Sequence, residues 1–256
     1  MGYFALGSKV YVQVYAVVYA LLFWSAVTYP SHLLSWGALG FVLSLVGMKM
    51  ITALKFFRLR LWRLVMFMTI HTWATLVYAF MIDGMLYVYI SLVFSLIIAY
   101  LFLSRVYHYR HSDEGAWGSM MLSSLPVFIF DGFATFASLA GARVFFGVSW
   151  WWLSIGIAVF VYILSYIMLW FWAIASYERY SGALVASLIL VELFLVLQLL
   201  PLSIFVNAAL LVIAWIIYLN ALRLVHAHGE ERSMWVRFVY AGTVSVLIML
   251  VTSSWR

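Results

Sequence analysis

The chain has 256 residues, of which 68% are apolar and 9% are charged, and its mean hydropathy is +1.12. Soluble domains carry about 25% charged residues, so this composition excludes a soluble globular protein and predicts an all-α integral membrane protein. The formal net charge is +6, but most basic residues stand at the ends of apolar runs, where they orient membrane helices, and this placement argues against nucleic-acid binding. The absence of cysteine excludes disulfides, thiolate metal ligands and a cysteine nucleophile.

Nine apolar segments follow one another along the chain, and each is long enough to cross the roughly 30 Å hydrocarbon core as a helix. We expect them at about residues 10–29, 34–56, 61–82, 85–106, 119–141, 146–176, 181–200, 202–225 and 235–251. The sixth is the longest and is expected to tilt or to extend beyond the core, with connections at 141–143 before it and 177–180 after it. The whole chain, residues 1–256, is thus predicted to be one transmembrane domain, a polytopic bundle of about nine helices.

The basic residues predict how this bundle is oriented. If all nine segments cross, one side collects eleven lysines and arginines and the other collects two. The larger set is Lys9, Lys55, Arg58, Arg60, Arg63, Arg105, Arg110, Arg179, Arg223, Arg232 and Arg237, and the smaller set is Arg143 and Arg256. Because positive charge stays in the cytoplasm, the N-terminus is predicted to be cytoplasmic and the C-terminus outside, with a prokaryotic inner (plasma) membrane as the expected location. Were segment 119–141 re-entrant, the last four of the larger set would move outward and the smaller set inward, which leaves nine against four.

Three ionisable side chains lie near the middle of their segments: His71 in the third, Asp131 in the fifth and Glu192 in the seventh. At 1.5 Å per residue each is about 15–18 Å from the predicted cytoplasmic edge, so all three are expected at one depth. Ionisable groups at mid-depth are expensive and mark proton relays or substrate cavities. The alternative is that each packs separately, neutral and hydrogen-bonded to a neighbouring helix, with residues such as Thr75 as partners.

Lys49 lies within the second segment, toward the predicted inner edge. Its aliphatic stem allows the ammonium group to snorkel to the membrane interface. The alternative is a buried ion pair with Asp131 or Glu192, which would make Lys49 the fourth member of the relay.

Two histidine clusters are predicted at the cytoplasmic edge. Their members are His108, His111, Asp113 and Glu114 in the first cluster and His226, His228, Glu230 and Glu231 in the second. Imidazole and carboxylate ligands together suit zinc or a di-iron centre, and both clusters are predicted on the same side. The alternative is that they are ordinary solvated helix ends, where cations favour the negative end of the helix dipole.

Aromatic residues make up 20% of the chain. The tryptophan-rich runs 150–152 and 170–172 are expected to form interfacial belts, and a cavity for an apolar or lipid-like ligand is the alternative. Small residues at helical spacing, Gly40, Ser44 and Gly47, predict close helix packing in the second segment.

These features favour a small membrane transporter or carrier, coupled to protons or another cation through the midplane residues. Two alternatives stay open. One is a membrane-embedded enzyme that acts on a lipid-like substrate with a metal at the histidine clusters, and the other is a structural or assembly subunit of a larger membrane complex. The sequence names neither a cofactor nor a substrate, and the expected partners are the lipid bilayer and either further copies of the chain or a larger complex.

Overall fold

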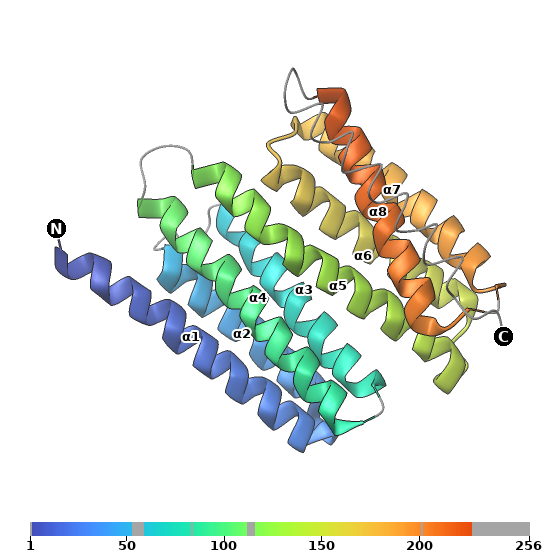
Figure 1. The fold of residues 1–256 in the computed structure, drawn as a ribbon, viewed down its shortest axis with the longest axis horizontal. Coiled ribbons are helices and arrows are strands. Elements are labelled where there is room, and N and C mark those ends of the chain that lie inside the picture. Colours follow the sequence, from blue (N-terminus) through green and yellow to red (C-terminus); the bar gives the residue numbers. More distant parts are fainter. Residues whose placement is uncertain (1, 53–58, 83, 112–115, 201, 227–256) are drawn as a thin grey trace. The chain divides into compact units, whose positions relative to one another are not determined.

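The computed structural model describes residues 2–52, 59–82, 84–111, 116–200 and 202–226. Within these ranges the chain forms eight long α-helices and one short 3-10 helix, and it contains no strand (Figure 1). The elements are α1 (Gly2–Thr28), η1 (Pro30–His32), α2 (Leu33–Thr52), α3 (Leu59–Met81), α4 (Met85–His111), α5 (Ala116–Phe146), α6 (Trp150–Phe171), α7 (Ser176–Leu197) and α8 (Ile204–His226).

The eight α-helices account for eight apolar stretches of 19 to 24 residues. A helix of that length is about 30 Å long, which is the thickness of the hydrocarbon core. The prediction of an all-α integral membrane protein with many spans is therefore confirmed for eight helices. The predicted ninth segment, 235–251, lies outside the described residues, and the side of the membrane on which each terminus lies stays a prediction.

The predicted sixth segment, 146–176, is wrong at its start. Helix α5 continues through the expected connection at 141–143 and ends at Phe146. The chain then turns at Gly147, whose φ of +64° is left-handed backbone that glycine adopts without steric cost, and α6 begins at Trp150. Apolar residues on both sides of this glycine hide the break from the hydropathy pattern.

The predicted sixth segment is also wrong at its end. Ala173 has a φ of +57°, and the Ile174 N–H donates to the Leu169 carbonyl oxygen at 3.1 Å. These are features of a Schellman motif, in which glycine usually takes the left-handed position. Because alanine occupies the left-handed position here, the sequence has no glycine that would indicate the turn. Helix α7 then begins at Ser176, so residues 177–180, predicted as a connection, are helical.

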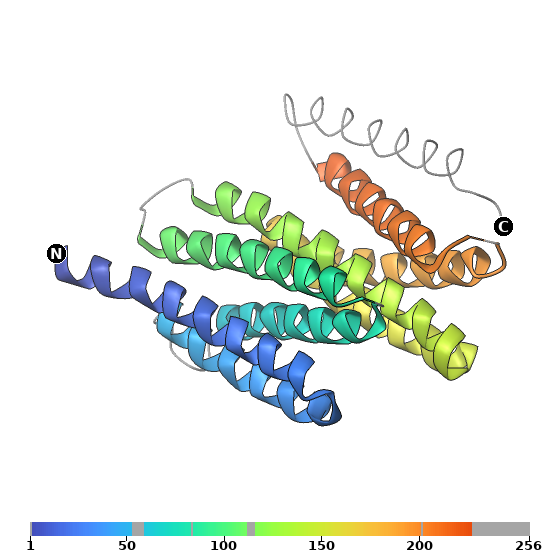
Figure 2. The same cartoon turned by 60° about the horizontal axis from the view of Figure 1, so that its bottom comes forward.

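The described helices form two compact units, one within residues 1–131 and the other within residues 132–256, and the boundary falls inside α5. In the first unit, α1 to α4 lie side by side in both views (Figure 1 and Figure 2), with α1 packed on α2 and α4, and α2 packed on α3. In the second unit, α7 packs on both α6 and α8. That the whole chain behaves as one transmembrane domain stays a prediction.

Small residues bring α2 close to its neighbours in the first unit, as the sequence predicted. A Cβ atom added to Gly47 would lie 2.0 Å from the Tyr15 ring of α1, and one added to Gly40 would lie 2.5 Å from Thr72 of α3. Ser44 is fully buried, and its hydroxyl donates to the Gly40 carbonyl oxygen at 2.8 Å. Helix α2 thus packs against α1 and α3 through positions at which no larger side chain fits.

A tryptophan of α8 lies in the core of the second unit. Trp215 is fully buried, and its indole N–H donates to Ser165 Oγ of α6 at 2.7 Å. Its ring meets Phe136 and Phe160 at centroid distances of 5.7 and 6.0 Å. The hydrogen bond satisfies the one polar atom of the ring, so the indole is buried without an unpaired donor.

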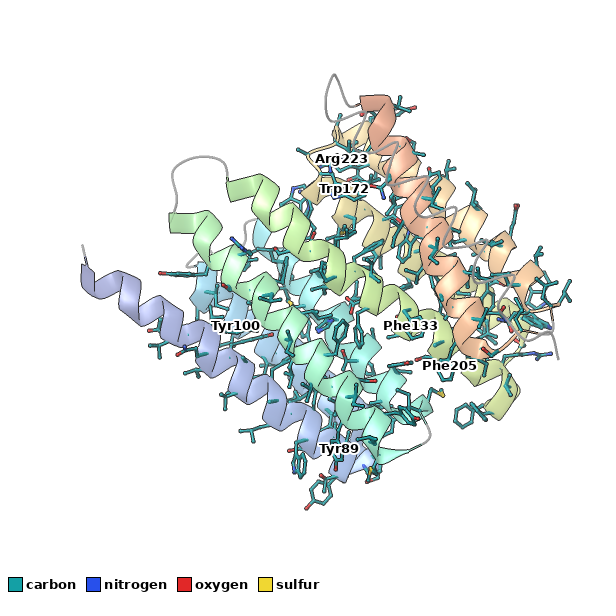
Figure 3. The ribbon with its side chains drawn as sticks, viewed as in Figure 1. Tyr89, Tyr100, Phe133, Trp172, Phe205 and Arg223 are labelled. Carbon is teal, nitrogen blue, oxygen red and sulfur yellow. The ribbon has the colours of Figure 1, made fainter. Side chains whose placement is uncertain are left out.

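The two tryptophan-rich runs have different environments. Trp151 and Trp152 are exposed at the start of α6, as an interfacial belt requires. Trp170 and Trp172 are buried, so the belt predicted there is wrong. The Arg223 guanidinium of α8 lies over the Trp172 ring, 5.6 Å from its centroid, in a cation–π contact (Figure 3).

Gly47→Ala is expected to destabilise the protein, because the new methyl group would overlap the buried Tyr15 ring and force it to move. Overpacking of this kind costs about 1–3 kcal/mol, so thermal unfolding in detergent should occur at a lower temperature than in the wild type. Gly156→Ala is the matched control, since a Cβ at that helical position would lie 3.8 Å from Leu139, an ordinary contact. Equal unfolding temperatures for the two variants would contradict the close packing of α2.

Candidate functional site

The structure joins two of the predicted midplane residues in a buried pair. His71 stands at the centre of the α3 apolar stretch Leu61–Met81, and Asp131 stands near the centre of the α5 stretch Ser123–Phe146. Nδ1 of His71 lies 2.6 Å from Oδ1 of Asp131, and both side chains are fully buried. A contact this short between two ionisable groups is a strong hydrogen bond. It links α3 to α5 within the first unit.

The other ring nitrogen of His71 faces α4. Nε2 lies 2.9 Å from Oγ and 3.3 Å from the carbonyl oxygen of Ser95. Ser95 Oγ lies 2.8 Å from Thr75 Oγ1, and the Thr75 hydroxyl donates to the His71 carbonyl oxygen at 2.8 Å. All three side chains are buried. The polar chain therefore begins at the ring of His71 and ends at the backbone of the same residue.

These contacts determine which atoms carry hydrogen. Thr75 has one hydroxyl hydrogen and directs it to the His71 carbonyl oxygen, which can only accept. The bond between Thr75 and Ser95 then uses the Ser95 hydroxyl hydrogen, so Ser95 Oγ accepts from Nε2 of His71. The Ser95 carbonyl oxygen leads to the same result independently, because it too can only accept. Nε2 of His71 is therefore protonated.

A hydrogen on Nε2 constrains the other nitrogen of the ring. In neutral imidazole, Nδ1 would then be a bare lone pair, and it would face the bare lone pairs of an ionised Asp131 Oδ1 across 2.6 Å. A hydrogen bond at this place requires one more proton between the two atoms. The pair is then either imidazolium with carboxylate or imidazole with carboxylic acid, and its net charge is zero in both forms. Neutrality also avoids the large cost of an isolated buried charge. The two side chains therefore share one proton.

The second carboxylate oxygen of Asp131 has a different environment. Oδ2 is buried and has no hydrogen-bond partner among the described residues. Most buried polar atoms in proteins are paired, and an exception calls for an explanation such as a catalytic role or a bound water or ion. Oδ2 therefore has unused capacity to accept a hydrogen bond or to bind a cation.

Aromatic rings enclose the imidazole. The Tyr19 ring of α1 stacks on it with a centroid distance of 6.3 Å and planes 10° apart, and the Tyr19 hydroxyl is hydrogen-bonded to Thr72. The Phe130 ring of α5 lies 5.8 Å from the imidazole. Phe130 also contacts Phe94 of α4 at 5.9 Å, and Phe94 is exposed. Phe130 therefore connects the buried pair with an exposed ring on α4.

Glu192 and Lys49 do not share the burial of this pair. Glu192 is exposed on α7 in the second unit, and Lys49 is exposed on α2 in the first. An exposed lysine fits the snorkelling interpretation. Asp131 is not its partner, because Oδ1 of Asp131 contacts His71 and Oδ2 has no partner among the described residues. A pair between Lys49 and Glu192 stays a prediction. That Glu192 approaches His71 and Asp131 stays a prediction.

The side chains of all four predicted metal ligands lie outside the described residues; these are His108, His111, His226 and His228. In the part of the chain that the structure describes, no three His, Asp or Glu side chains are grouped so that they could hold a metal ion. A metal at the histidine clusters therefore stays a prediction.

Sequence reasoning anticipates Thr75 as a partner but misses Ser95 and Tyr19. Ser95 lies in the middle of the α4 apolar stretch Met85–Tyr107, at the depth where His71 needs a partner. That depth is the available signal. It is weak, because a serine in a helix also satisfies itself by bonding to a carbonyl oxygen in the preceding turn.

Comparison with known proteins gives no match: no protein-family model, curated protein or solved structure is significantly similar to this chain. Function is therefore inferred from the chemistry of the site, since a fold by itself does not imply a function.

Asp131→Ala is expected to lower the free energy of unfolding by about 3–5 kcal/mol, the usual cost of leaving one partner of a buried ion pair alone. Asp131→Asn should cost less, roughly 1 kcal/mol, since the amide can donate to Nδ1 of His71 in a neutral pair of similar shape. Unfolding by heat or denaturant in detergent micelles measures both values. Losses of equal size would show that the hydrogen bond to His71 contributes nothing to stability.

Proposed function

We propose that this protein is a small proton-coupled membrane carrier, and that the His71–Asp131 pair is the group that takes up and releases the proton. The observation that carries the proposal is the short contact between the two side chains, fully buried in the middle of two apolar helices. Ionisable residues at such positions are expensive to maintain, and in membrane proteins they mark proton and ion pathways.

The chemical make-up of the pair supports exchange of the proton over a purely structural role. Neutral hydrogen bonds are sufficient to join two membrane helices, as Trp215 and Ser165 join α8 to α6 in the second unit. The first unit instead combines a carboxyl group with imidazole, the side chain type whose ordinary charge change lies closest to neutral pH. Such a pair combines an acid and a base in one hydrogen bond, which is the chemistry that proton exchange needs.

The distribution of mass along the chain supports transport. Eight helices contain apolar stretches of 19 to 24 residues, which leaves few described residues outside a membrane. Transporters commonly bind substrates and coupling ions near the bilayer midplane, where His71 and Asp131 are expected. No contact between described residues favours the two alternatives, a metal-dependent membrane enzyme and an assembly subunit.

Purified protein in proteoliposomes is expected to carry protons down an imposed pH gradient, measured with pyranine trapped inside the vesicles. Asp131→Asn should reduce the rate to that of protein-free vesicles, because the amide preserves the shape of the site but cannot release a proton. His71→Gln should have the same effect, because Asp131 then loses the base with which it shares the proton.

Glu178→Gln is the control for these measurements, because it removes a carboxylate in the first turn of α7, outside the predicted midplane residues. We expect this variant to carry protons at the wild-type rate. Wild-type protein that carries no protons, or an Asp131→Asn variant that carries them as fast as the wild type, would sink the proposal.

Ser95→Ala is expected to slow proton flux about fivefold, the factor that corresponds to the roughly 1 kcal/mol of a lost hydrogen bond. Ser95 Oγ accepts the Nε2 hydrogen of His71 and so favours the tautomer that directs Nδ1 to Asp131. The ¹⁵N resonances of His71 should shift as well, which a general loss of packing would not cause. Ser138→Ala is the control, since Ser138 is also buried but donates to the Ala134 carbonyl oxygen of its own helix. Equal slowing by both variants would contradict the role of Ser95.

A further inference from the structure

We infer that the His71–Asp131 pair exchanges its shared proton for a small, singly charged cation, which binds at Asp131 Oδ2. This inference rests on the proposed function and adds the class of the second ion. It draws on two observations: the proton-bearing contact of 2.6 Å between the side chains, and the buried Oδ2 atom with no partner among the described residues.

Loss of the shared proton changes the charge of a fully buried site. With the proton in place the pair is neutral, whichever of the two atoms holds it. Without the proton, Asp131 is an ionised carboxylate beside a neutral imidazole, and the site carries one net negative charge in a region of low dielectric constant. An uncompensated buried charge of this kind is strongly unfavourable. Release of the proton therefore requires a positive charge to take its place.

The described part of the chain supplies no such charge. Among the Lys, Arg, His, Asp and Glu side chains that the structure describes, His71 and Asp131 alone are buried. Lys49, which the sequence suggested as a partner for Asp131, is exposed. In the proposed exchange, the compensating cation comes from solution.

The deprotonated pair presents three acceptor atoms to a cation. Nδ1 of His71 and Oδ1 of Asp131 would be left as two bare lone pairs 2.6 Å apart, and Oδ2 already lacks a partner. Carboxylate oxygens bind alkali and other hard cations, and all three atoms can accept hydrogen bonds from an N–H donor. A cation at Oδ2 is therefore bound by the same carboxylate that has just lost the proton.

The charge of the site determines the charge of the ligand. One positive charge restores the net neutrality of the protonated pair, whereas a divalent ion would leave a buried positive charge. A divalent metal would also need further ligands, and the described residues hold no group of three His, Asp or Glu side chains for it. Alkali ions and small organic cations with N–H groups share the required chemistry. In each cycle one proton leaves as one such cation enters, so the exchange moves no net charge.

The other groups around the imidazole do not change this balance. Tyr19 of α1 stacks on the ring, but a tyrosine side chain is either neutral or negative and never positive. Helix α4 presents the Ser95 hydroxyl, and α2 meets α3 through Gly40 beside Thr72. Because none of these four residues carries a positive charge, the exchange depends on the pair itself.

Proteoliposomes that contain pyranine and an acidic interior test the exchange. Proton efflux is measured after addition of LiCl, NaCl, KCl or guanidinium chloride, with N-methyl-D-glucamine chloride as the large-cation control. At least one of the small cations is expected to raise the rate about tenfold or more above the control, a factor equivalent to about 1.4 kcal/mol. An imposed membrane potential should leave this rate unchanged, because the exchange is electroneutral.

Proton release on binding provides a second readout that does not depend on transport. Addition of the active salt to the purified protein in weakly buffered detergent solution should release about one proton per chain. Asp131→Asn should release none, and Glu178→Gln should release as many as the wild type.

These outcomes separate the cation exchange from the proton carrier. Flux that depends on Asp131 but is equal in all salts, including N-methyl-D-glucamine chloride, would overturn the exchange and leave the carrier intact. Flux that only a divalent cation drives, or proton release that persists in Asp131→Asn, would also overturn the exchange. Wild-type protein without flux in any salt would remove the carrier and the exchange together.

Discussion

Two ionisable side chains can be buried in the middle of membrane helices when they neutralise each other, and His71 and Asp131 do so across 2.6 Å. The hydrocarbon core offers no water to either group, so each depends on the other for its hydrogen bond and for its charge balance. If either partner is removed, a polar atom of the other loses its hydrogen bond, and no described neighbour replaces the lost partner. The same contact joins α3 to α5, so the stability of the first unit and the chemistry of its centre depend on one proton.

The helices around the pair hold the imidazole in place. Thr72, next to His71 in the chain, is where three helices meet: its methyl group faces Gly40 of α2, and its hydroxyl is bonded to Tyr19 of α1. The hydroxyl of Thr72 donates to the Met68 carbonyl oxygen of its own helix, so the Tyr19 hydroxyl donates to Thr72. The Tyr19 ring is thereby fixed in the position where it stacks on the imidazole. Close packing through glycine and the orientation of the site are therefore parts of one arrangement.

Depth along a helix was sufficient to predict that His71 and Asp131 lie near the middle of their spans, but it could not show which face of each helix packs inward. In a soluble helix an apolar stripe marks the buried face, whereas a membrane helix is apolar all around because lipid and protein interior are alike in polarity. For that reason the sequence could not distinguish buried Asp131 from exposed Glu192, since each is a carboxylate within an apolar stretch. The same uniformity concealed the helix break at Gly147 and the left-handed alanine that follows α6.

Thr75 closes the polar chain on the backbone of His71 itself, since its hydroxyl donates to that carbonyl oxygen. A carbonyl oxygen has no hydrogen to pass on, so the branch through Ser95 and Thr75 is a dead end for a migrating proton. Among the described contacts, a proton that reaches the imidazole from Asp131 can depart only through Asp131 again. A site that gains and loses its proton through one residue does not form a continuous proton pathway between the two faces of a membrane. In the proposed carrier, the Thr75 hydroxyl would therefore prevent protons from leaking along this branch.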